Sequence, residues 1–554
     1  MRSRALLLTL LMVLTLCALA APALAGSDAQ VVDENPALTA RLQAIVDDPV
    51  YTLPGLVVLT MQGGEVTYTG NLGHRYIDGV DPANSLPVDE YSMFRIASIS
   101  KLVAAVGIMQ QVEAGNIDLD ADVSTYLGFT LRNPHFPDVP ITCRHLMSHT
   151  SSIRDGSTYS RPLDVPLSAA FFPPSDYYTG ARWESAHPTI DKSPGKYFTY
   201  ANLNYGVLAT VLENVTGELF ATYMNDHVLD PMGIDGGYVP ALFGQWEIEN
   251  VGVLYRQEDG AWAPQVDDYQ GVIPDPPAGF DVYVPGFNAT WQSPQGGLRI
   301  STWDLAKVMK MFINGGTYEG TQILEPETVE LMFTPYWTYD PALDNGDTYY
   351  DLMMSYGLGP HIMTNTAGDR ILADWDIFMS GHLGEAYGLW SGFMFDDETG
   401  DGFIYYVTGR WGPAEFGEYS TFYLTEERVM TALFEEQLLP VDDWSGMLPP
   451  VKADGSSVFR IGRAVPLRFR LYDECGDPVA GMTPILSLAR LCDGEWGEEF
   501  KPRSKTPPKT SDVFRYRAGT YVYNLDTKGL TAGTYRARIA IGAGAQLYAE
   551  FSLR

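Results

Sequence analysis

One apolar stretch, residues 101–114, constrains the fold of this chain more than any other feature. Its apolar residues recur at helical spacing and also cover the remaining faces, and Gly115 follows as a C-cap. A helix without a polar face must lie inside a domain. Just before it, Ser98 and Lys101 stand three residues apart, so the amine can reach the hydroxyl and help to take its proton. The sequence therefore predicts a buried helix with a nucleophile and its activator at its start.

Strand patterns at both ends of a long segment enclose this helix. Residues 56–60 and 65–68 flank Gly63-Gly64 and predict a hairpin, and two late strands are predicted over 388–395 and 403–408. Further helices are predicted over 201–216 and 302–314. Strands at both ends with helices between them indicate an α/β body whose sheet is closed by remote parts of the chain.

The pattern changes after about residue 440, where Leu448-Pro449-Pro450 forms a proline-rich joint. Short runs with period-two alternation follow, with Arg468, Arg470, Arg536 and Arg538 opposite apolar residues. This predicts a small all-β sandwich domain over 446–554, after a body over 26–445. We expect the arginines to form a solvated sheet face, and contact with an anionic cell-envelope polymer is the alternative.

The first 25 residues are typical of a signal peptide: Arg2 and Arg4, an apolar stretch, and Ala23-Leu24-Ala25 as a cleavage site. Export to the periplasm or the outside is therefore expected, with no membrane span after cleavage because no later run is long and apolar enough. Export permits a disulfide, and whether Cys475 and Cys492 form one is left open.

The formal net charge of the chain is −33. Positive charge is concentrated after residue 446, so the body is more acidic still. Such a body repels nucleic acid and anionic lipid, which leaves a small molecule or a peptide as the expected partner.

A second motif, around Tyr200 and Asn202, lies in a segment that leads into a predicted helix. From an extended or turn segment these two side chains point the same way, which places a phenol as proton carrier and an amide as positioning donor. Tyr223 and Asn225 have the same spacing inside a predicted helix, where the side chains splay. Likewise Ser193 and Lys196 repeat the first spacing, but the intervening Pro194-Gly195 forbids a helical turn.

The third motif is Ser380-Gly381-His382-Leu383-Gly384, just before the late strands. A strand that borders the cleft is expected to present His382 to the leaving group. The backbone N–H beyond Gly384, that of Glu385, is expected to join the N–H of Ser98 in polarising a carbonyl.

Each motif also has a structural alternative. Ser98 and Lys101 would be a helix cap and a surface lysine, Tyr200 and Asn202 a plain turn, and His382 a buried histidine. His145 and His149 have metal-ligand spacing without an evident third ligand, and the acidic turn 396–402 lacks the EF-hand register. We therefore expect neither a metal nor another cofactor.

With these motifs the chain resembles the β-lactamase-related serine hydrolases of the class C type, a family that includes DD-peptidases, D-aminopeptidases and esterases. Ser98 and Lys101 match its first motif, Tyr200 and Asn202 its second, and His382 and Gly384 the His-x-Gly variant of its third. The resemblance covers roughly residues 40–435 and implies an antiparallel sheet flanked by helices, with a helical lobe. Glu385 stands where the family usually has a small residue, at the edge expected to bind substrate through Gly384 and Glu385.

After the joint, Pro466-Leu467-Arg468-Phe469 resembles the Pro-x-Lys-Phe signature of small β-sandwich modules on exported bacterial proteins, with arginine in place of the lysine. The resemblance carries no activity.

The family resemblance implies acyl transfer in two steps through Ser98, with Lys101 and Tyr200 accepting its proton. Histidine is largely neutral at pH 7, so His382 in place of the family's lysine weakens the charge that holds a substrate carboxylate. This disfavours an efficient β-lactamase. The first expectation is a D-amino-acid (D-Ala-type) peptidase of the cell envelope, the second a carboxylesterase, and the alternative from another class a catalytically silent penicillin-binding-type protein.

Overall fold

The structure is a computed structural model that describes residues 35–554 apart from 374, 439–442, 453–454, 473–477, 480–481, 483, 493–494, 498, 507–511, 518 and 542–544. The expected signal peptide over 1–25 lies outside the described residues, as do Cys475 and the side chain of Cys492. Export and the disulfide therefore stay predictions. Cys143 is a buried free thiol, and burial raises its pKa to about 12.

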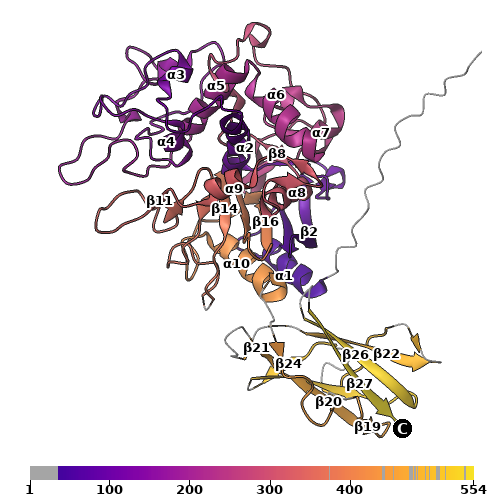
Figure 1. The fold of residues 1–554 in the computed structure, drawn as a ribbon. Helices are drawn as coiled ribbons and strands as arrows, with labels where there is room; N and C mark the ends of the chain where they lie inside the picture. Colours follow the sequence, from indigo (N-terminus) through magenta and orange to yellow (C-terminus); the bar gives the residue numbers. More distant parts are fainter. Residues whose placement is uncertain are drawn as a thin grey trace, which may run out of the picture. The chain divides into compact units, whose positions relative to one another are not determined.

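In the described part of the chain, nine strands form one sheet in the order β11-β12-β13-β14-β15-β16-β1-β2-β3 (Figure 1). Their bounds are β1 (Gly55–Gln62), β2 (Glu65–Tyr76), β3 (Leu86–Pro87), β11 (Trp337–Thr338), β12 (Ser355–Tyr356), β13 (His361–Ile362), β14 (Ser380–Ala386), β15 (Leu389–Phe395) and β16 (Gly402–Val407). The predicted hairpin and both late strands are confirmed, and the second strand of the hairpin, β2, continues well beyond its predicted end at residue 68. Strand β1 pairs antiparallel with β16, so remote parts of the chain do close the sheet.

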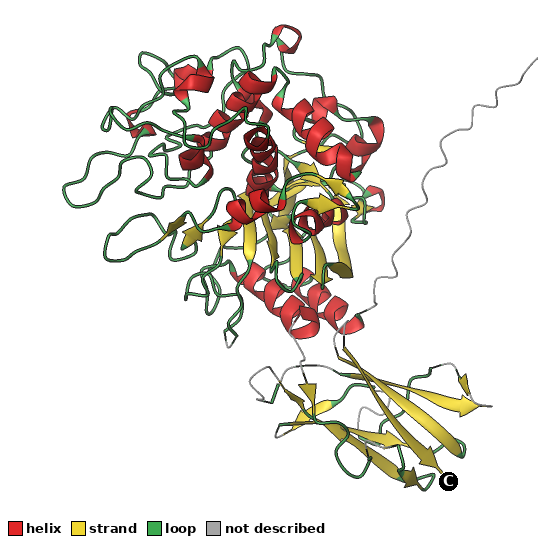
Figure 2. Cartoon of the chain, viewed as in Figure 1, coloured by secondary structure: helices red, strands yellow, loops and turns green. Residues whose placement is uncertain are grey.

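The helices lie between and around these strands (Figure 2). Their bounds are α1 (Pro36–Val46), α2 (Ser100–Glu113), α3 (Ser124–Leu127), α4 (Cys143–Met147), α5 (Leu203–Thr216), α6 (Phe220–Met224), α7 (Gln245–Asn250), α8 (Thr302–Ile313), α9 (Pro326–Phe333) and α10 (Leu424–Leu433). The three predicted long helices correspond to α2, α5 and α8, with ends that differ by at most two residues.

The two faces of the sheet bury separate sets of side chains. Because successive strand residues point to opposite faces, Val57 and Leu59 pack with α2 and α8, whereas Leu56 and Val58 pack with α1 and α10. Helix α2 is buried along nearly its whole length, as its pattern predicts. The sheet therefore lies between two helical layers, which confirms the predicted α/β body.

Smaller strands complete the body. β4 (Phe94–Arg95), β8 (Arg299–Ile300) and β5 (Gly236–Gly237) form one small sheet. β17 (Gly409–Arg410), β6 (Leu254–Glu258) and β7 (Ala261–Val266) form a second, and β9 (Thr317–Tyr318) with β10 (Thr321–Gln322) a third.

Among its described residues, the C-terminal region forms strands and no helix, as predicted (Figure 2). Its strands are β18 (Asp443–Trp444), β19 (Val458–Phe459), β20 (Ala464–Phe469), β21 (Leu471–Tyr472), β22 (Ile485–Cys492), β23 (Glu495–Trp496), β24 (Arg515–Arg517), β25 (Thr520–Asp526), β26 (Gly533–Ile541) and β27 (Ala545–Leu553). Val465, Leu467 and Phe469 are buried in its core, while Arg468 between them is exposed. Arg536 and Arg538 form ion pairs with Glu550 and Glu499.

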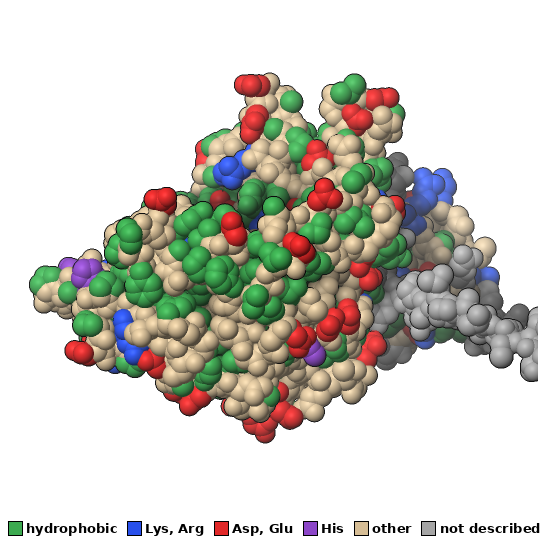
Figure 3. Space-filling model, turned by 90° about the horizontal axis from the view of Figure 1, so that it is seen from above, with side chains coloured by type: hydrophobic (Ala, Val, Ile, Leu, Met, Phe, Trp, Pro, Cys, Tyr) green, Lys and Arg blue, Asp and Glu red, His purple; other side chains and the backbone are tan. Residues whose placement is uncertain are grey.

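The surface reflects the acidic composition. The face of the molecule in Figure 3 carries scattered acidic side chains and few basic ones. Within the described residues, no helix combines the length and the apolar character needed to cross a bilayer.

Candidate active site

Ser98 lies in a short 3₁₀ turn, Ala97–Ile99, which runs directly into α2. Ala97 has a φ of 49°, a left-handed conformation that is uncommon outside glycine and is often found at functional sites. The turn directs Ser98 toward a pocket, while Ala97 and Ile99 are anchored in the core on either side of it.

Lys101, one turn further along, is completely buried beneath Ser98. Its Nζ donates three hydrogen bonds of 2.8 Å, to Ser98 Oγ, Asn202 Oδ1 and the backbone carbonyl of Gln295. Burial lowers the pKa of Lys101 to about 7, and the attraction of Asp155 acts in the opposite direction. A sizeable fraction of this amine is therefore neutral at neutral pH and able to accept a proton.

Tyr200 is the second group beside the nucleophile: it lines the same pocket as Ser98, and Ser98 acts to lower the pKa of its phenol. The ring of His149 stacks on the Tyr200 ring at a centroid distance of 4.2 Å, and Lys101 Nζ lies 4.8 Å from the Tyr200 centroid. Burial raises the pKa of Tyr200 well above its usual value, so the phenol keeps its proton and can donate it.

Asn202 is oriented by a carboxylate that the sequence did not reveal. Its Nδ2 donates to Asp155 Oδ2 at 2.8 Å, and the other oxygen of Asp155 accepts the backbone N–H of Leu203 at 2.9 Å. With Nδ2 held by Asp155, Oδ1 of Asn202 is left to face Lys101. Asp155 lies far from Asn202 in the sequence, and no motif connects the two.

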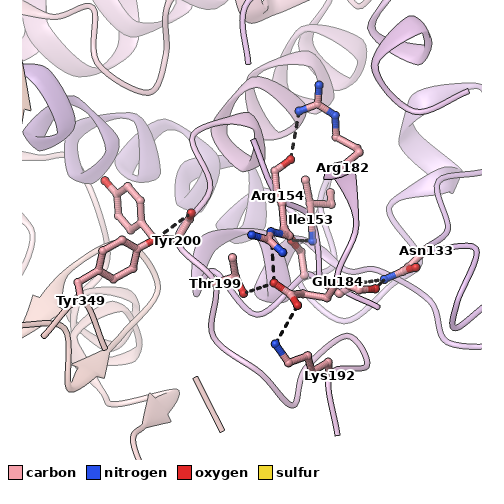
Figure 4. Close-up of polar contacts among 11 residues, drawn as sticks. Asn133, Ile153, Arg154, Arg182, Glu184, Lys192, Thr199, Tyr200 and Tyr349 are labelled. Atoms are coloured by element: carbon pink, nitrogen blue, oxygen red, sulfur yellow. Dashed lines mark hydrogen bonds and ion pairs between the residues drawn. The ribbon is translucent and has the colours of Figure 1, made fainter. Parts of the chain in front are cut away.

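A buried carboxylate, Glu184, anchors the segment that carries Tyr200 (Figure 4). Thr199 Oγ1 donates to Glu184 Oε1 at 3.0 Å, and Glu184 also forms ion pairs with Lys192 and Arg154 at 3.1 and 3.5 Å. The Tyr349 hydroxyl donates to the carbonyl oxygen of Tyr200 at 3.4 Å. Sequence reasoning missed Glu184, because no pattern relates it to Thr199.

His382 lies in β14 but not where the sequence expectation placed it. The imidazole is fully buried, and residues 383–385, not His382, line the pocket. Its Nδ1 lies 2.6 Å from the carbonyl oxygen of Leu383 and its Nε2 2.8 Å from the Tyr356 hydroxyl, so Nδ1 donates and Nε2 accepts. Its ring centroid is 6.1 Å from that of Tyr200. The expectation that the strand presents His382 to the leaving group is therefore corrected: His382 supports Tyr200 from the core.

Burial and the nearby Lys101 hold the pKa of His382 well below its usual value. The imidazole is therefore neutral and adds no positive charge to the site.

Gly384 allows β14 to approach the turn of the nucleophile. A Cβ at this position would lie 2.3 Å from Ser391 Oγ and 2.6 Å from the carbonyl oxygen of Ile96. On its other side β14 pairs with β13 only at Ser380 and Gly381, so the rest of that edge faces the pocket without a neighbouring strand. This arrangement brings the backbone at 384–385 to the side of Ser98, as the proposed carbonyl-polarising pair requires.

Glu385 lines the pocket, and its side chain turns toward Tyr423, whose hydroxyl donates to Glu385 Oε2 at 3.1 Å. The carboxylate therefore lies beside the pocket edge, and the approach of the strand to Ser98 does not depend on a small side chain here.

The pocket has a volume of about 280 Å³. The nucleophile, Tyr200 and Asn202 line it together with the edge of β14, and Tyr349, Leu352, Met353 and Trp390 supply apolar and aromatic surface. The structure thus gathers Ser98, Lys101, Tyr200 and Asn202 around one cavity, with His382 behind them.

Two of the patterns set aside at the sequence level, Tyr223 with Asn225 and Ser193 with Lys196, lie outside the pocket lining, whereas His149 lies against Tyr200. Tyr223 donates to Gln110 through its hydroxyl, and Ser193 donates to Asp191. Nδ1 of His149 accepts the backbone N–H of Ala201 at 3.2 Å. In the part of the chain that the structure describes, no three His, Cys, Asp or Glu side chains converge as metal ligands.

Comparison with known proteins places these features in a family. The family model described as Beta-lactamase matches residues 39–434. Esterase EstB of Burkholderia gladioli is 28% identical over 269 residues, which are 45% of this chain and 64% of EstB. Protein flp of Staphylococcus aureus is 25% identical over 262 residues, 47% of this chain and 46% of flp. The chain thus spans less than two thirds of the length of these curated relatives.

Among solved structures, EstCE1, titled a hydrolase with promiscuous acyltransferase activity, aligns with a TM-score of 0.50 at 21% identity and covers 72% of this chain and 99% of that chain. This likeness shows the fold. Since the family model also covers well over half of the chain, the protein belongs to the Beta-lactamase family.

Proposed function

We propose that the protein is a serine hydrolase that cleaves amide or ester bonds through an acyl-enzyme on Ser98. The observation that carries this proposal is the 2.8 Å hydrogen bond between the Ser98 hydroxyl and a buried Lys101 whose pKa is about 7. An amine that is partly neutral can take the hydroxyl proton as the oxygen attacks, which activates a nucleophile that is otherwise weak.

The remaining groups complete the reaction in this proposal. The attacked carbonyl oxygen accepts hydrogen bonds from the backbone N–H groups of Ser98 and Glu385. As the bond to the leaving group breaks, Tyr200 donates its proton to that group and is reprotonated from Lys101. Water then attacks the acyl-enzyme and gives a proton to the same pair. This pair returns the proton to Ser98 Oγ as its bond to the acyl group breaks, which releases the acid and restores the hydroxyl.

The pocket charge supports a substrate whose leaving group carries no carboxylate. Of the described residues that line the pocket, Arg95 alone is basic, whereas Glu385 and Glu426 are acidic. Tyr349 packs edge-on against Tyr200 at a centroid distance of 6.2 Å, and this side of the pocket continues with Leu352 and Met353. A leaving group beside Tyr200 therefore meets neutral and apolar surface.

Within this class, a D-amino-acid (D-Ala-type) peptidase remains the first proposal and a carboxylesterase the second. The apolar side chains of Leu352, Met353 and Leu383 on the pocket wall favour the second. AmpH of Escherichia coli, named a D-alanyl-D-alanine-carboxypeptidase/endopeptidase, is 28% identical over 163 residues, 29% of this chain and 40% of AmpH, which supports the first. Export of the protein, and contact of its C-terminal domain with a cell-envelope polymer, are also proposals and rest on the sequence.

The test is covalent labelling of the wild type and of Ser98→Ala with a fluorophosphonate and a fluorescent penicillin. Labelling of the wild type alone is the expected result, together with loss of hydrolysis by about 10³-fold or more in the variant. Labelling of neither protein would instead favour a silent binding protein. Comparing D-alanyl amides with short-chain p-nitrophenyl esters then separates the two substrate proposals.

A further inference from the structure

Arg95 places a guanidinium on the pocket wall, three residues before the nucleophile. It lies in β4, and its Nε donates to the carbonyl oxygen of Gly296 at 2.8 Å. Its Cζ lies 4.9 Å from the ring centroid of Tyr387. No residue in the described ranges accepts a hydrogen bond from either Nη atom or forms an ion pair with this side chain. The guanidinium is thus held in place while its terminal donors stay available.

The charge of Arg95 is not balanced by its surroundings. Arg299 and Asp267 lie nearby, but both oxygens of Asp267 accept hydrogen bonds from Arg299, at 2.7 and 3.0 Å. Two guanidinium groups therefore share one carboxylate. Burial and the neighbouring Arg299 lower the pKa of Arg95, although a guanidinium keeps its proton at any physiological pH. A half-buried charge without a carboxylate of its own is unfavourable, so this end of the pocket favours an anion.

Two phenols lie with Arg95 on the same wall. Tyr387 follows directly after β14, and Tyr159 comes from the loop beyond α4. Both line the pocket and can donate hydrogen bonds. Because Tyr387 lies beyond Gly384 and Glu385 along β14, this group is separated from the Tyr200 side, where the leaving group departs. Arg95 and the two phenols therefore face the acyl part of a bound substrate.

We propose that Arg95, with Tyr159 and Tyr387, binds a free carboxylate on the acyl part of the substrate. The favoured substrates are then half-esters or half-amides of dicarboxylic acids, including acyl residues that carry a side-chain carboxylate. This inference rests on the proposed function, since it needs an acyl group on Ser98. Planar guanidinium donors match a carboxylate in geometry as well as charge.

The test compares two esters of similar length, mono-p-nitrophenyl glutarate and p-nitrophenyl hexanoate. The quantity measured is the ratio of their kcat/KM values in the wild type, Arg95→Gln and Arg256→Gln. A charge-assisted hydrogen bond is worth roughly 10- to 100-fold in binding, so the ratio should fall by about that factor in Arg95→Gln. Arg256 is exposed and outside the pocket lining, so its variant removes the same charge and should keep the wild-type ratio.

The outcomes separate this inference from the proposed function. An unchanged ratio in Arg95→Gln, with hydrolysis that still depends on Ser98, would overturn the carboxylate site alone. Failure of the wild type to hydrolyse any ester or amide would overturn the proposed function. Arg95→Gln that is not labelled by fluorophosphonate has lost its active site, and the carboxylate site is then tested by inhibition of the wild type. Glutarate should inhibit hydrolysis of p-nitrophenyl hexanoate more strongly than hexanoate does. Equal or weaker inhibition by glutarate would refute the site.

Discussion

Lys101 is completely buried, and all three of its N–H donors form hydrogen bonds to protein oxygens. The protonated form of such an amine is destabilised because burial removes its hydration. The three acceptors do not compensate this loss fully, which is why the pKa of Lys101 falls to about 7. A lysine with that pKa divides its population between the protonated and the neutral form near neutral pH.

The pH dependence of kcat/KM should therefore follow the protonation of Lys101. Only the neutral amine accepts the Ser98 proton, so kcat/KM should rise about tenfold per pH unit below pH 7 and level off above it. Lys101→Arg should abolish turnover, since a guanidinium keeps its proton. Steady-state kinetics between pH 5 and 9 at constant ionic strength checks both points, and a flat profile would contradict this role.

Asp155 offers a second test at this scale. It attracts the Lys101 ammonium and so raises its pKa, and it also holds the Asn202 amide. In Asp155→Asn the midpoint of the pH profile should move to lower pH, and kcat should fall roughly tenfold because Asn202 loses its orientation. Asp164→Asn, an exposed position in the same lobe, removes the same charge and should change neither quantity.

At the residue scale the motifs predicted which side chains meet but not what holds them. Ser98 with Lys101, and Tyr200 with Asn202, are close in sequence, so local geometry determines their directions. Asp155 and Glu184 act across long loops, where sequence spacing carries no geometric information. His382 was placed wrongly because which face of a strand packs against the core depends on neighbouring elements.

The element that matters most to the site is β14, through its contact with the turn Ala97–Ile99. The strand pairs fully with β15 but with β13 only at its start. One strand edge is thereby free to line the pocket beside Ser98.

Gly384→Ala should disrupt this contact. The new Cβ would meet Ser391 Oγ at 2.3 Å and the backbone oxygen of Ile96 at 2.6 Å, so β14 must move away from Ser98. We expect kcat to fall by about 10²- to 10³-fold, the usual cost of losing one oxyanion donor. Gly79→Ala is the matched control, since its Cβ has no neighbour within 4 Å. Equal kinetics for the two variants would argue against an oxyanion role for this strand.

Elements with a long and regular pattern could be predicted from the sequence. The apolar period predicted α2, α5 and α8, and the two segments joined by the acidic turn 396–402 predicted β15 and β16. The two-residue strands β4, β5, β8 and β11–β13 could not be predicted, because so few residues carry no period and the pairing depends on remote partners. These short strands position Arg95 and close the sheet beside His382.

On the scale of the whole molecule, the body and the C-terminal region have separate cores. The buried side chains of the two body clusters on either side of the large sheet come from residues 38–438, and those of the sandwich core from 447–553. The change of pattern near residue 440 predicts a domain boundary there, which stays a prediction. The order of the strands in the large sheet could not be predicted, since it depends on pairing between remote segments.

Separate cores should give separate unfolding transitions. We expect differential scanning calorimetry of the full chain to resolve two transitions. A fluorophosphonate phosphonylates Ser98 with loss of fluoride and so modifies only the body, which should raise one transition temperature and leave the other in place. One transition that moves as a whole would show that the two regions unfold together.

The pairing of β1 with β16 has a consequence for the time at which the protein becomes active. Strand β1, an interior strand of the large sheet, comes from residues 55–62, and one of its two neighbours comes from residues 402–407. A nascent chain that has not yet reached residue 407 leaves β1 with a bare edge, and it also lacks β14 beside Ser98 if it stops before residue 380. Ser98 is therefore synthesised long before the strands that complete its site. An incomplete chain would lack the arrangement that activates the nucleophile.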